Sequence, residues 1–103
     1  MLQSELDGKR VVVALGGNAL GETPGEQLKL LENTSKNLAH MVKEGINVVV
    51  THGNGPQVGI IDEAFEVASK DKDAQVPPMS LSDCNAMSQG YIGAQLSCAL
   101  RNE

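Results

Sequence analysis

The fold is decided by two apolar stretches that each run directly into glycine. Residues 11–17 have the sequence Val-Val-Val-Ala-Leu-Gly-Gly, and residues 46–53 have the sequence Ile-Asn-Val-Val-Val-Thr-His-Gly. The β-branched runs have no polar face, which predicts strands that are buried on both faces, as in a parallel sheet. We therefore expect strands at residues 11–15 and 46–51.

A helix is predicted between these two strands. Thr23 suits the N-cap position, Pro24 the first helical position and Glu26 the third position, which completes a capping box. Apolar residues at helical spacing continue to Glu44, and Gly45 is a natural C-terminal stop. A strand, a helix and a strand of these lengths form a βαβ unit, whose crossover is expected to be right-handed.

Two more helices are predicted after the second strand. The first of them ends near Lys70 and has apolar residues at helical spacing, namely Val58, Ile61, Phe65 and Ala68. Residues 71–78 are charged and finish in a Pro-Pro pair, so we expect an exposed loop there. The last helix starts near Ser80 and carries one stripe, made of Cys84, Met87, Tyr91, Ala94 and Cys98.

The last helix also has an unusually small face, formed by Ala86, Gly90 and Gly93. A glycine inside a helix costs about 1 kcal/mol relative to alanine. Two such residues predict close approach by another backbone, either within the domain or across a subunit interface. The polar residues of this helix are assigned to capping or to the exposed surface, namely Ser82, Ser88 and Gln89.

The length and charge of the chain narrow the classes of protein to which it can belong. Its 103 residues allow one domain at most, and 13 acidic against 8 Lys and Arg residues give a net charge of −5. No basic surface is predicted for nucleic acid or for a membrane. No apolar run approaches the roughly 20 residues of a membrane span, and the first residues do not resemble a signal peptide. We expect a soluble, cytoplasmic protein.

Cys84 and Cys98 are not expected to form a disulfide or a metal site. They lie fourteen residues apart in one predicted helix, which separates them by about 21 Å at about 1.5 Å per residue. A disulfide needs Cα atoms within about 7 Å of each other. Both residues are predicted to be small buried thiols in a reducing compartment.

The predicted strands are too few for an independent sheet. A parallel sheet of two strands is marginal in water, and strands without a polar face need cover on both sides. The predicted helices supply only part of that cover. The pattern is therefore typical of the opening of a larger α/β domain.

Glycine–asparagine loops follow both strands and form the main candidate site. They consist of Gly16, Gly17 and Asn18 after the first strand, and of Gly53, Asn54 and Gly55 after the second. Parallel sheets bind ligands outside the carboxyl ends of their strands, where glycines let backbone N–H groups approach an anion. Pro56 also indicates a helix N-terminus there, whose dipole favours negative charge. The two loops predict a site that holds one small anionic group from two sides.

The loops differ from two common phosphate motifs, and they lack a paired general base. The first loop has neither the Gly-Lys-Ser/Thr of a P-loop nor the third glycine of the dinucleotide fingerprint. His52 has no orienting carboxylate or nucleophile that the sequence identifies, so a structural role is favoured. Asp62 and Glu63 are expected on the exposed face of the helix that follows.

Three segments of the chain resemble carbamate kinases. They are residues 12–20 (Val-Val-Ala-Leu-Gly-Gly-Asn-Ala-Leu), 51–59 (Thr-His-Gly-Asn-Gly-Pro-Gln-Val-Gly) and 84–93 (Cys-Asn-Ala-Met-Ser-Gln-Gly-Tyr-Ile-Gly). The segments occur in the family's order, and the resemblance covers residues 9–100. Ala14 favours carbamate kinases over other members of the amino-acid kinase superfamily, many of which resemble this chain but carry a lysine there.

The resemblance implies a three-layer αβα sandwich around a mainly parallel sheet, in an enzyme active as a homodimer. The implied reaction is reversible phosphoryl transfer between ATP and carbamate, usually run from carbamoyl phosphate and ADP, in arginine metabolism. Residues 1–103 would form the N-terminal part of the domain, with carbamate or carbamoyl phosphate held by the six loop residues. ATP or ADP with Mg²⁺ would bind to a nucleotide lobe that these residues do not contain.

The family's catalytic lysines also lie outside these residues, and Lys9 precedes the first strand, where it is poorly placed to replace them. We therefore expect no kinase activity from this chain alone. Two other interpretations stay open, namely a kinase of the same superfamily for another small carboxylate or phosphate, and a non-catalytic anion-binding or interaction module. A dinucleotide-binding unit is disfavoured because Thr51 ends the second strand, where that unit needs an acidic residue.

Overall fold

The two apolar stretches form a pair of parallel strands. The computed structural model describes residues 8–16 and 20–103. Strand β1 covers Arg10–Leu15 and strand β2 covers Asn47–His52, with Val12 opposite Val49 in the middle of the register. Among the described residues, the sheet consists of these two strands. The prediction of a parallel βαβ unit is confirmed.

Helix α2 connects the two strands and has the termini that its sequence predicts. It covers Pro24–Lys43, and the Thr23 hydroxyl accepts a hydrogen bond from the Glu26 N–H at 3.1 Å. The Glu26 carboxylate accepts from the N–H of Glu22 at 2.9 Å, one residue earlier than in a standard capping box. Gly45 follows the helix with a φ of +87°, which favours glycine because it has no Cβ.

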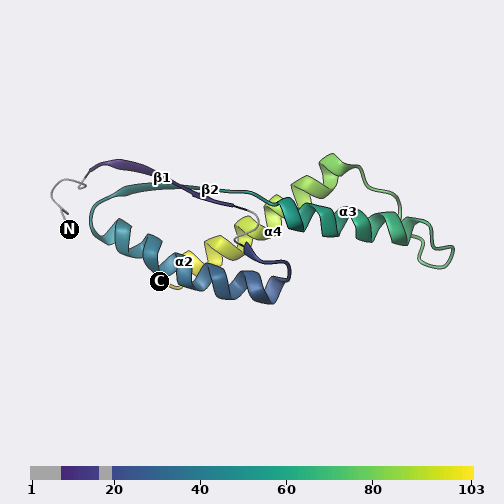
Figure 1. The fold of residues 1–103 in the computed structure, drawn as a ribbon, viewed down its shortest axis with the longest axis horizontal. Helices are drawn as coiled ribbons and strands as arrows, with labels where there is room; N and C mark the ends of the chain where they lie inside the picture. The colour runs from purple at the N-terminus through teal and green to yellow at the C-terminus, as the bar shows by residue number, and fades with distance from the viewer. Residues whose placement is uncertain (1–7, 17–19) are drawn as a thin grey trace.

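Helices α3 and α4 run beside each other and extend beyond the sheet (Figure 1). Helix α3 covers Gly55–Ser69 and helix α4 covers Leu81–Arg101. Residues 70–80 join them and are mostly exposed. Ser80 caps α4, since its hydroxyl accepts a hydrogen bond from the Asp83 N–H at 3.1 Å. The hairpin gives the molecule an elongated shape, with principal extents of 62 × 22 × 19 Å.

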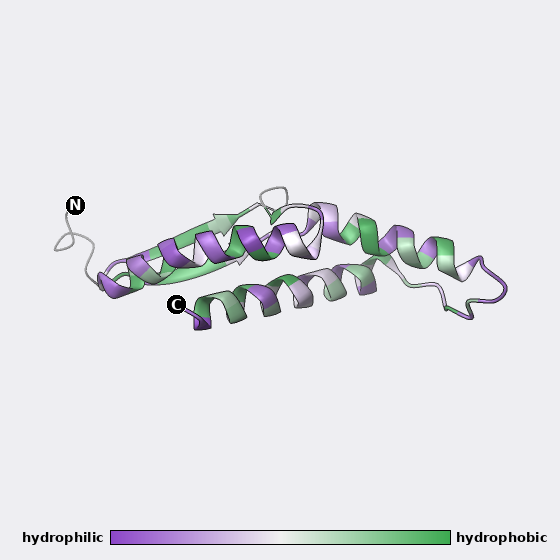
Figure 2. Cartoon of the chain, turned by 90° about the horizontal axis from the view of Figure 1, so that it is seen from below, coloured by the Kyte–Doolittle hydropathy of each residue, from purple (hydrophilic) through white to green (hydrophobic). Residues whose placement is uncertain are grey.

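The core lies between one face of the sheet and the helices α2 and α4. Its buried members are Leu20, Leu31, Leu38, Ile92, Leu96 and Ala99. The strand side chains that pack against this cluster are Val13, Leu15, Val48 and Val50. Figure 1 shows α2 and α4 on the same side of the strands, and in Figure 2 the outer surface of α2 carries many hydrophilic residues. The described residues thus form a sheet and one helical layer.

Among the described residues the strands are buried on one face only, so the prediction of burial on both faces does not hold for them. The prediction that the helices supply only part of the cover is confirmed. Side chains alternate along each strand between the core and the opposite face, which is open. On that open face Val12 is 65% exposed and Val49 is 48% exposed. The physical reason is that α2 and α4 cover the same side of the sheet, and none of the described residues covers the other side.

The buried stripe of α4 also differs from the predicted one. Cys84 is buried as expected, but Met87, Ala94 and Cys98 are exposed, and Tyr91 is half-buried. The buried side chains are Cys84, Ser88, Ile92, Leu96 and Ala99. The assignment of Ser88 to the surface and the prediction of a buried thiol at Cys98 are therefore both wrong.

Among the described residues, no second backbone approaches the small face of α4. A Cβ added to Gly90 would meet nothing within 4 Å, and one added to Gly93 would meet the His52 ring, at 3.8 Å from Nε2. The prediction of close backbone approach within the domain is therefore wrong for these residues. Approach across a subunit interface stays a prediction.

Candidate functional site

The two strands end side by side, and the glycine-containing loops leave the sheet from the same edge. Leu15 lies opposite His52 in the register, and the N–H of Gly53 donates a hydrogen bond to the Leu15 carbonyl at 2.9 Å. This bond continues the parallel ladder beyond β2 and places the start of the second loop beside Gly16. The predicted juxtaposition of the two loops is confirmed for this part of the site.

The structure places four of the six predicted site residues at this edge, namely Gly16, Gly53, Asn54 and Gly55. Gly17 and Asn18 lie outside the described residues. The phosphoryl-binding role of all six residues stays a prediction.

Asn54 links the second loop to helix α4. It occupies the N-cap position of α3 but makes no side-chain hydrogen bond to that helix. Its Nδ2 instead donates to Oδ1 of Asn85 at 2.7 Å and to Oγ of Ser88 at 2.5 Å. Ser88 is fully buried and donates in turn to the Asn85 carbonyl at 2.9 Å. The Asn54 amide therefore holds the loop in position.

The N-terminus of α3 points its first backbone N–H groups toward the same edge. The first N–H groups of an α-helix have no acceptor within the helix, and Asn54 does not cap them with its side chain. Pro56 has no N–H, which leaves those of Gly55 and Gln57 in the first turn. Together with the helix dipole, these groups favour an anion at this position.

Gln57 joins the beginning of α3 to the segment that follows the first loop. Its side chain is 1% exposed, and its Nε2 donates to the Gly21 carbonyl at 2.8 Å. Gly21 has a φ of +76°, and a Cβ there would lie 2.8 Å from Cβ of Glu26. Only glycine fits this turn without strain, so the contact with Gln57 depends on the backbone at Gly21.

His52 occupies a structural position at the end of β2. Its Nδ1 lies 3.2 Å from the Gly53 carbonyl oxygen, and its ring faces Gly93 on α4. Among the described residues no carboxylate is hydrogen-bonded to the ring. The structural role favoured by the sequence stays a prediction.

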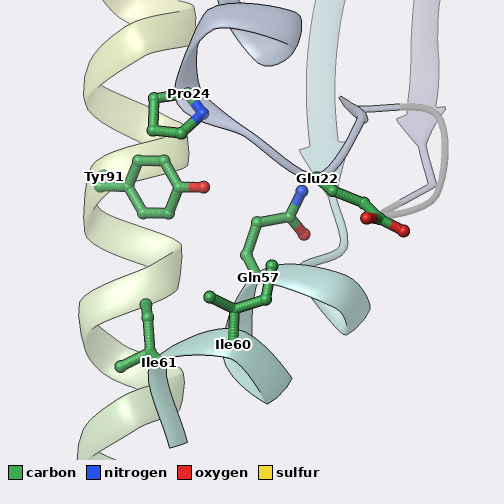
Figure 3. A pocket seen from close by; sticks show the side chains of 6 residues that line it. All are labelled: Glu22, Pro24, Gln57, Ile60, Ile61 and Tyr91. Atoms are coloured by element: carbon green, nitrogen blue, oxygen red, sulfur yellow. The ribbon is translucent and has the colours of Figure 1, made fainter. Parts of the chain in front are cut away.

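An apolar cavity of about 300 Å³ opens beside Gln57 (Figure 3). It is lined by Glu22, Pro24, Gln57, Ile60, Ile61 and Tyr91. The Tyr91 ring extends from α4 toward Gln57 in Figure 3, and burial raises the pKa of its hydroxyl. This hydroxyl therefore stays protonated at neutral pH. The sequence does not predict this cavity, because its walls come from three separate elements.

The buried thiol of Cys84 on α4 is not reactive. Burial raises the pKa of the Cys84 thiol, and the nearby carboxylates of Asp62 and Asp83 raise it further. Cys84 is thus protonated at neutral pH and a poor nucleophile. Asp62 is half-buried, so its predicted place on the exposed face is wrong, whereas Glu63 is exposed.

Among the described residues, few basic or metal-binding groups lie around the site. Lys9 lies at the other end of the sheet, where its carbonyl accepts a hydrogen bond from the Asn47 N–H. Six residues of strand separate it from the loops, or about 20 Å. In the described part of the chain, no group of His, Cys, Asp or Glu side chains could hold a metal ion. The same residues include no helix with the length and apolar character to cross a membrane.

Sequence reasoning missed three residues that build the site, namely Gln57, Asn85 and Ser88. A weak signal for them exists, since Gln57 follows Pro56 directly and Asn85 and Ser88 lie three residues apart on a helix. That spacing places both side chains on one side of α4. Their partner Asn54 could not be identified, because the contact depends on how α4 returns to the sheet.

Comparison with known proteins assigns the chain to a family. The model of the amino acid kinase family matches residues 9–99. Carbamate kinase 3 from Staphylococcus aureus (strain USA300) is 51% identical over 94 residues, which are 91% of this chain and 30% of that protein. The carbamate kinase-like protein YqeA from Escherichia coli (strain K12) is 50% identical over 95 residues, which are 92% of this chain and 30% of that protein. The chain therefore spans about 30% of the length of these relatives.

Solved structures agree with this assignment. The carbamate kinase from Giardia lamblia bound to AMP-PNP has a TM-score of 0.80 and 41% identity, over 91% of this chain and 33% of that chain. A protein from Aeropyrum pernix K1, solved as project APE1968, has a TM-score of 0.76 and 36% identity, over 92% of this chain and 30% of that chain. The resemblance to carbamate kinases and the incomplete αβα fold are thus confirmed. This chain belongs to the amino acid kinase family.

Proposed function

We propose that this chain forms the carbamate- and phosphoryl-binding part of a carbamate kinase. That enzyme would transfer a phosphoryl group reversibly between ATP and carbamate, usually from carbamoyl phosphate to ADP. The observation that supports the proposal is the hydrogen bond from the Gly53 N–H to the Leu15 carbonyl. It brings Gly16 and the second loop together at the N-terminus of α3, as a small anion requires.

We propose that the loop residues hold the transferred phosphoryl group and its acceptor, namely Gly16, Gly17, Asn18, Gly53, Asn54 and Gly55. Glycines allow backbone N–H groups to come within hydrogen-bond distance of phosphoryl oxygens. Phosphoryl transfer depends mainly on positioning and charge stabilisation, and these N–H groups would stabilise negative charge. Asn54 would act as a positioning residue, because its side-chain amide is bonded to α4.

ATP or ADP with Mg²⁺ is proposed as the co-substrate of an enzyme that contains this chain. The solved relative with AMP-PNP supports nucleotide use. The residues present do not fit a metal site, since no suitable group of His, Cys, Asp or Glu side chains occurs among those described. We therefore assign no Mg²⁺ ligand to this chain and derive no step from the ion.

We propose that the chain alone does not turn over substrate. The described site offers backbone N–H groups and amides, and Lys9 lies at the far end of the sheet. ATP formation from carbamoyl phosphate and ADP, followed in a coupled assay on the 103-residue chain, should stay at the background rate. Turnover above that rate would contradict this part of the proposal.

A chimera tests the function itself. In it, this chain replaces the 94 matched residues of the S. aureus carbamate kinase 3, and we expect the chimera to form ATP from carbamoyl phosphate. Gly16→Ala should lower kcat/KM at least tenfold, because a Cβ beside the first loop would hinder anion approach. Gly25→Ala is the matched control, since a Cβ at either glycine meets nothing within 4 Å of the folded chain. An inactive but folded chimera would contradict the proposed function.

A non-catalytic anion-binding module is the second candidate, because the described site offers backbone N–H groups for an anion but no basic side chain to assist phosphoryl transfer. Calorimetry with carbamoyl phosphate separates the two functions. A binding module should bind without nucleotide, whereas a part of a kinase should not bind measurably on its own.

We also propose that the enzyme containing this chain is a cytoplasmic homodimer in arginine metabolism, with no nucleic-acid or membrane partner. The support is the similarity to carbamate kinases and the acidic net charge of −5. Another small-carboxylate or phosphate kinase of the same family stays the alternative for substrate choice.

A further inference from the structure

Ser88 is a buried polar side chain of α4 to which the proposed reaction gives no role. It is 0% exposed and lies one helical turn before Ile92, which belongs to the core. Its hydroxyl accepts a hydrogen bond from Nδ2 of Asn54 at 2.5 Å and donates one to the Asn85 carbonyl at 2.9 Å. A buried hydroxyl is unfavourable unless it is hydrogen-bonded. The contact with Asn54 therefore gives a reason for a polar residue at this position of the helix.

Asn54 stands where an asparagine ordinarily caps a helix. Asparagine is among the preferred N-cap residues, and its side-chain oxygen then accepts a hydrogen bond from the second or third N–H of the helix. The second residue of α3 is Pro56, which has no N–H, so the Gln57 N–H is the group that Asn54 would cap. The Asn54 side chain makes no such bond. Its amide instead donates to Asn85 and Ser88.

The two acceptors on α4 hold the Asn54 amide together. A side-chain amide has two N–H donors, and Oδ1 of Asn85, at 2.7 Å, and Oγ of Ser88 provide one acceptor for each. Rotation of the Asn54 side chain toward the first turn of α3 would break both bonds. As long as they are intact, Asn54 does not compete with an anion for the Gln57 N–H.

We propose that Ser88, assisted by Asn85, is a positioning residue for phosphoryl binding, because it holds the Asn54 amide on α4 and keeps the Gln57 N–H available. Without Ser88, the Asn54 side chain can cap α3, and a fraction of the molecules is then in a state that does not bind the anion. The apparent affinity falls in proportion to the fraction that remains competent. This inference rests on the proposed function of the loops, since its ligand is the phosphoryl group proposed there.

The chimera with the S. aureus carbamate kinase 3 allows a kinetic test. Ser88→Ala should raise KM for carbamoyl phosphate about fivefold, as expected for the loss of one hydrogen bond. The kcat should change by less than about twofold, since every molecule that has bound substrate has a competent loop. Ser97→Ala is the matched control, because it removes an exposed serine of the same helix and should leave both parameters unchanged. A lower kcat with an unchanged KM in Ser88→Ala overturns the proposal.

A second variant covers the case in which Ser88→Ala does not fold. Asn85 is exposed, so Asn85→Ala should leave the fold intact and remove the other acceptor of the Asn54 amide. The expected rise in KM is about twofold, because water can replace an exposed hydrogen-bond partner. An unchanged KM in Asn85→Ala, in a chimera where Ser88→Ala is unfolded, overturns the proposal.

A double-mutant cycle shows whether Ser88 acts through Asn54. Asn54→Ala can neither cap α3 nor donate to α4. In that background Ser88→Ala should change KM by less than about twofold, because the two residues belong to one hydrogen-bond network. An effect of Ser88→Ala that is equally large with and without Asn54 would mean that Ser88 acts by packing alone, and it overturns the proposal.

A measurement without substrate separates this proposal from the proposed function. Hydrogen exchange of the Asn54 side-chain amide can be followed by NMR in the 103-residue chain. Ser88→Ala should accelerate it about fivefold, and Ser97→Ala should not change it. Equal exchange in the two variants overturns the proposal. A folded parent chimera without turnover contradicts the proposed function instead, and the NMR measurement still decides whether Ser88 holds Asn54.

Discussion

Helices α2 and α3 differ in how many of their side chains are buried. Helix α2 has a largely polar sequence and buries four residues in one stripe, namely Gln27, Leu31, Ser35 and Leu38. Helix α3 has a more apolar sequence but buries Gln57 alone, and its Ile60 and Val67 are exposed. The packing neighbours decide burial here, because α2 packs against both α4 and β2, whereas α3 packs mainly against α4.

The largest expected effect is on the buried stripe of α2. Leu31→Ala removes a side chain that is 0% exposed and should lower the free energy of unfolding by about 2–5 kcal/mol. Urea unfolding followed by circular dichroism measures this loss. The neighbour Leu30 is 42% exposed, and Leu30→Ala should change the free energy by at most about 0.5 kcal/mol. Equal losses in both variants would mean that α2 does not pack as described.

The second prediction concerns the one buried residue of α3. Gln57→Ala removes the hydrogen bond to the Gly21 carbonyl and should lower the free energy of unfolding by about 1–3 kcal/mol. Val67→Ala, at an exposed position on the same helix, should change it by about 0.5 kcal/mol or less. A larger loss at Val67 than at Gln57, measured by the same urea titration, would reverse the comparison between the helices.

The third prediction tests the turn at Gly21, which precedes α2 and accepts a hydrogen bond from Gln57 of α3. Gly21→Ala places a side chain at a φ of +76° and brings its Cβ to 2.8 Å from Cβ of Glu26. The left-handed conformation alone costs a non-glycine residue about 1–2 kcal/mol, and thermal unfolding should show a matching decrease. Gly25→Ala meets no atom within 4 Å, so its melting temperature should not fall. A Gly21→Ala variant as stable as the parent would rule out this geometry.

The smallest effect is expected at the exposed ion pair of α3. The Lys70 ammonium, first through its hydrogen bond and then through its charge, lowers the pKa of Glu66. The contribution to stability is therefore present above the ordinary glutamate pKa and is lost as the pH falls through the lowered value. Lys70→Met should raise the Glu66 pKa toward its ordinary value in an NMR titration. An unchanged pKa would mean that the pair, at 2.8 Å, does not form in solution.

The sequence predicts those parts of the fold that depend on local interactions. Thr23, Pro24 and Gly45 define the ends of α2 because capping and left-handed turns involve only a few consecutive residues. The parallel pairing of the strands also follows from local patterns, since two β-branched runs flank a helix. The juxtaposition of Gly16 with Gly53 then follows from the direction of parallel strands.

The remaining features depend on contacts between distant segments. The predicted stripe of α4 takes steps of three and four residues from Cys84, and the buried stripe reaches Ser88 and Ile92 by steps of four. Both choices fit a helix of small residues, and the choice depends on partners outside α4, namely the α2 side chains that pack on Ile92 and the Asn54 amide that donates to Ser88. No sequence pattern within α4 identifies Asn54 as the partner of Ser88. Which face of the sheet stays open cannot be predicted either, because the apolar content of the strands does not determine which side α4 covers.

The pairing of α2 with α4 has a consequence for how the chain folds during synthesis. Leu31 and Leu38 complete their cluster with Ile92, Leu96 and Ala99, and Gln27 bonds to Gln95 across 68 residues at 2.6 Å. The buried stripe of α2 therefore has the strands as partners at first, and it lacks its α4 partners until the end of α4 leaves the ribosome. Closure of so long a loop makes folding slow and late. Nascent chains that stop before Ile92 should remain open to proteases along α2, whereas chains that expose the whole of α4 should become resistant.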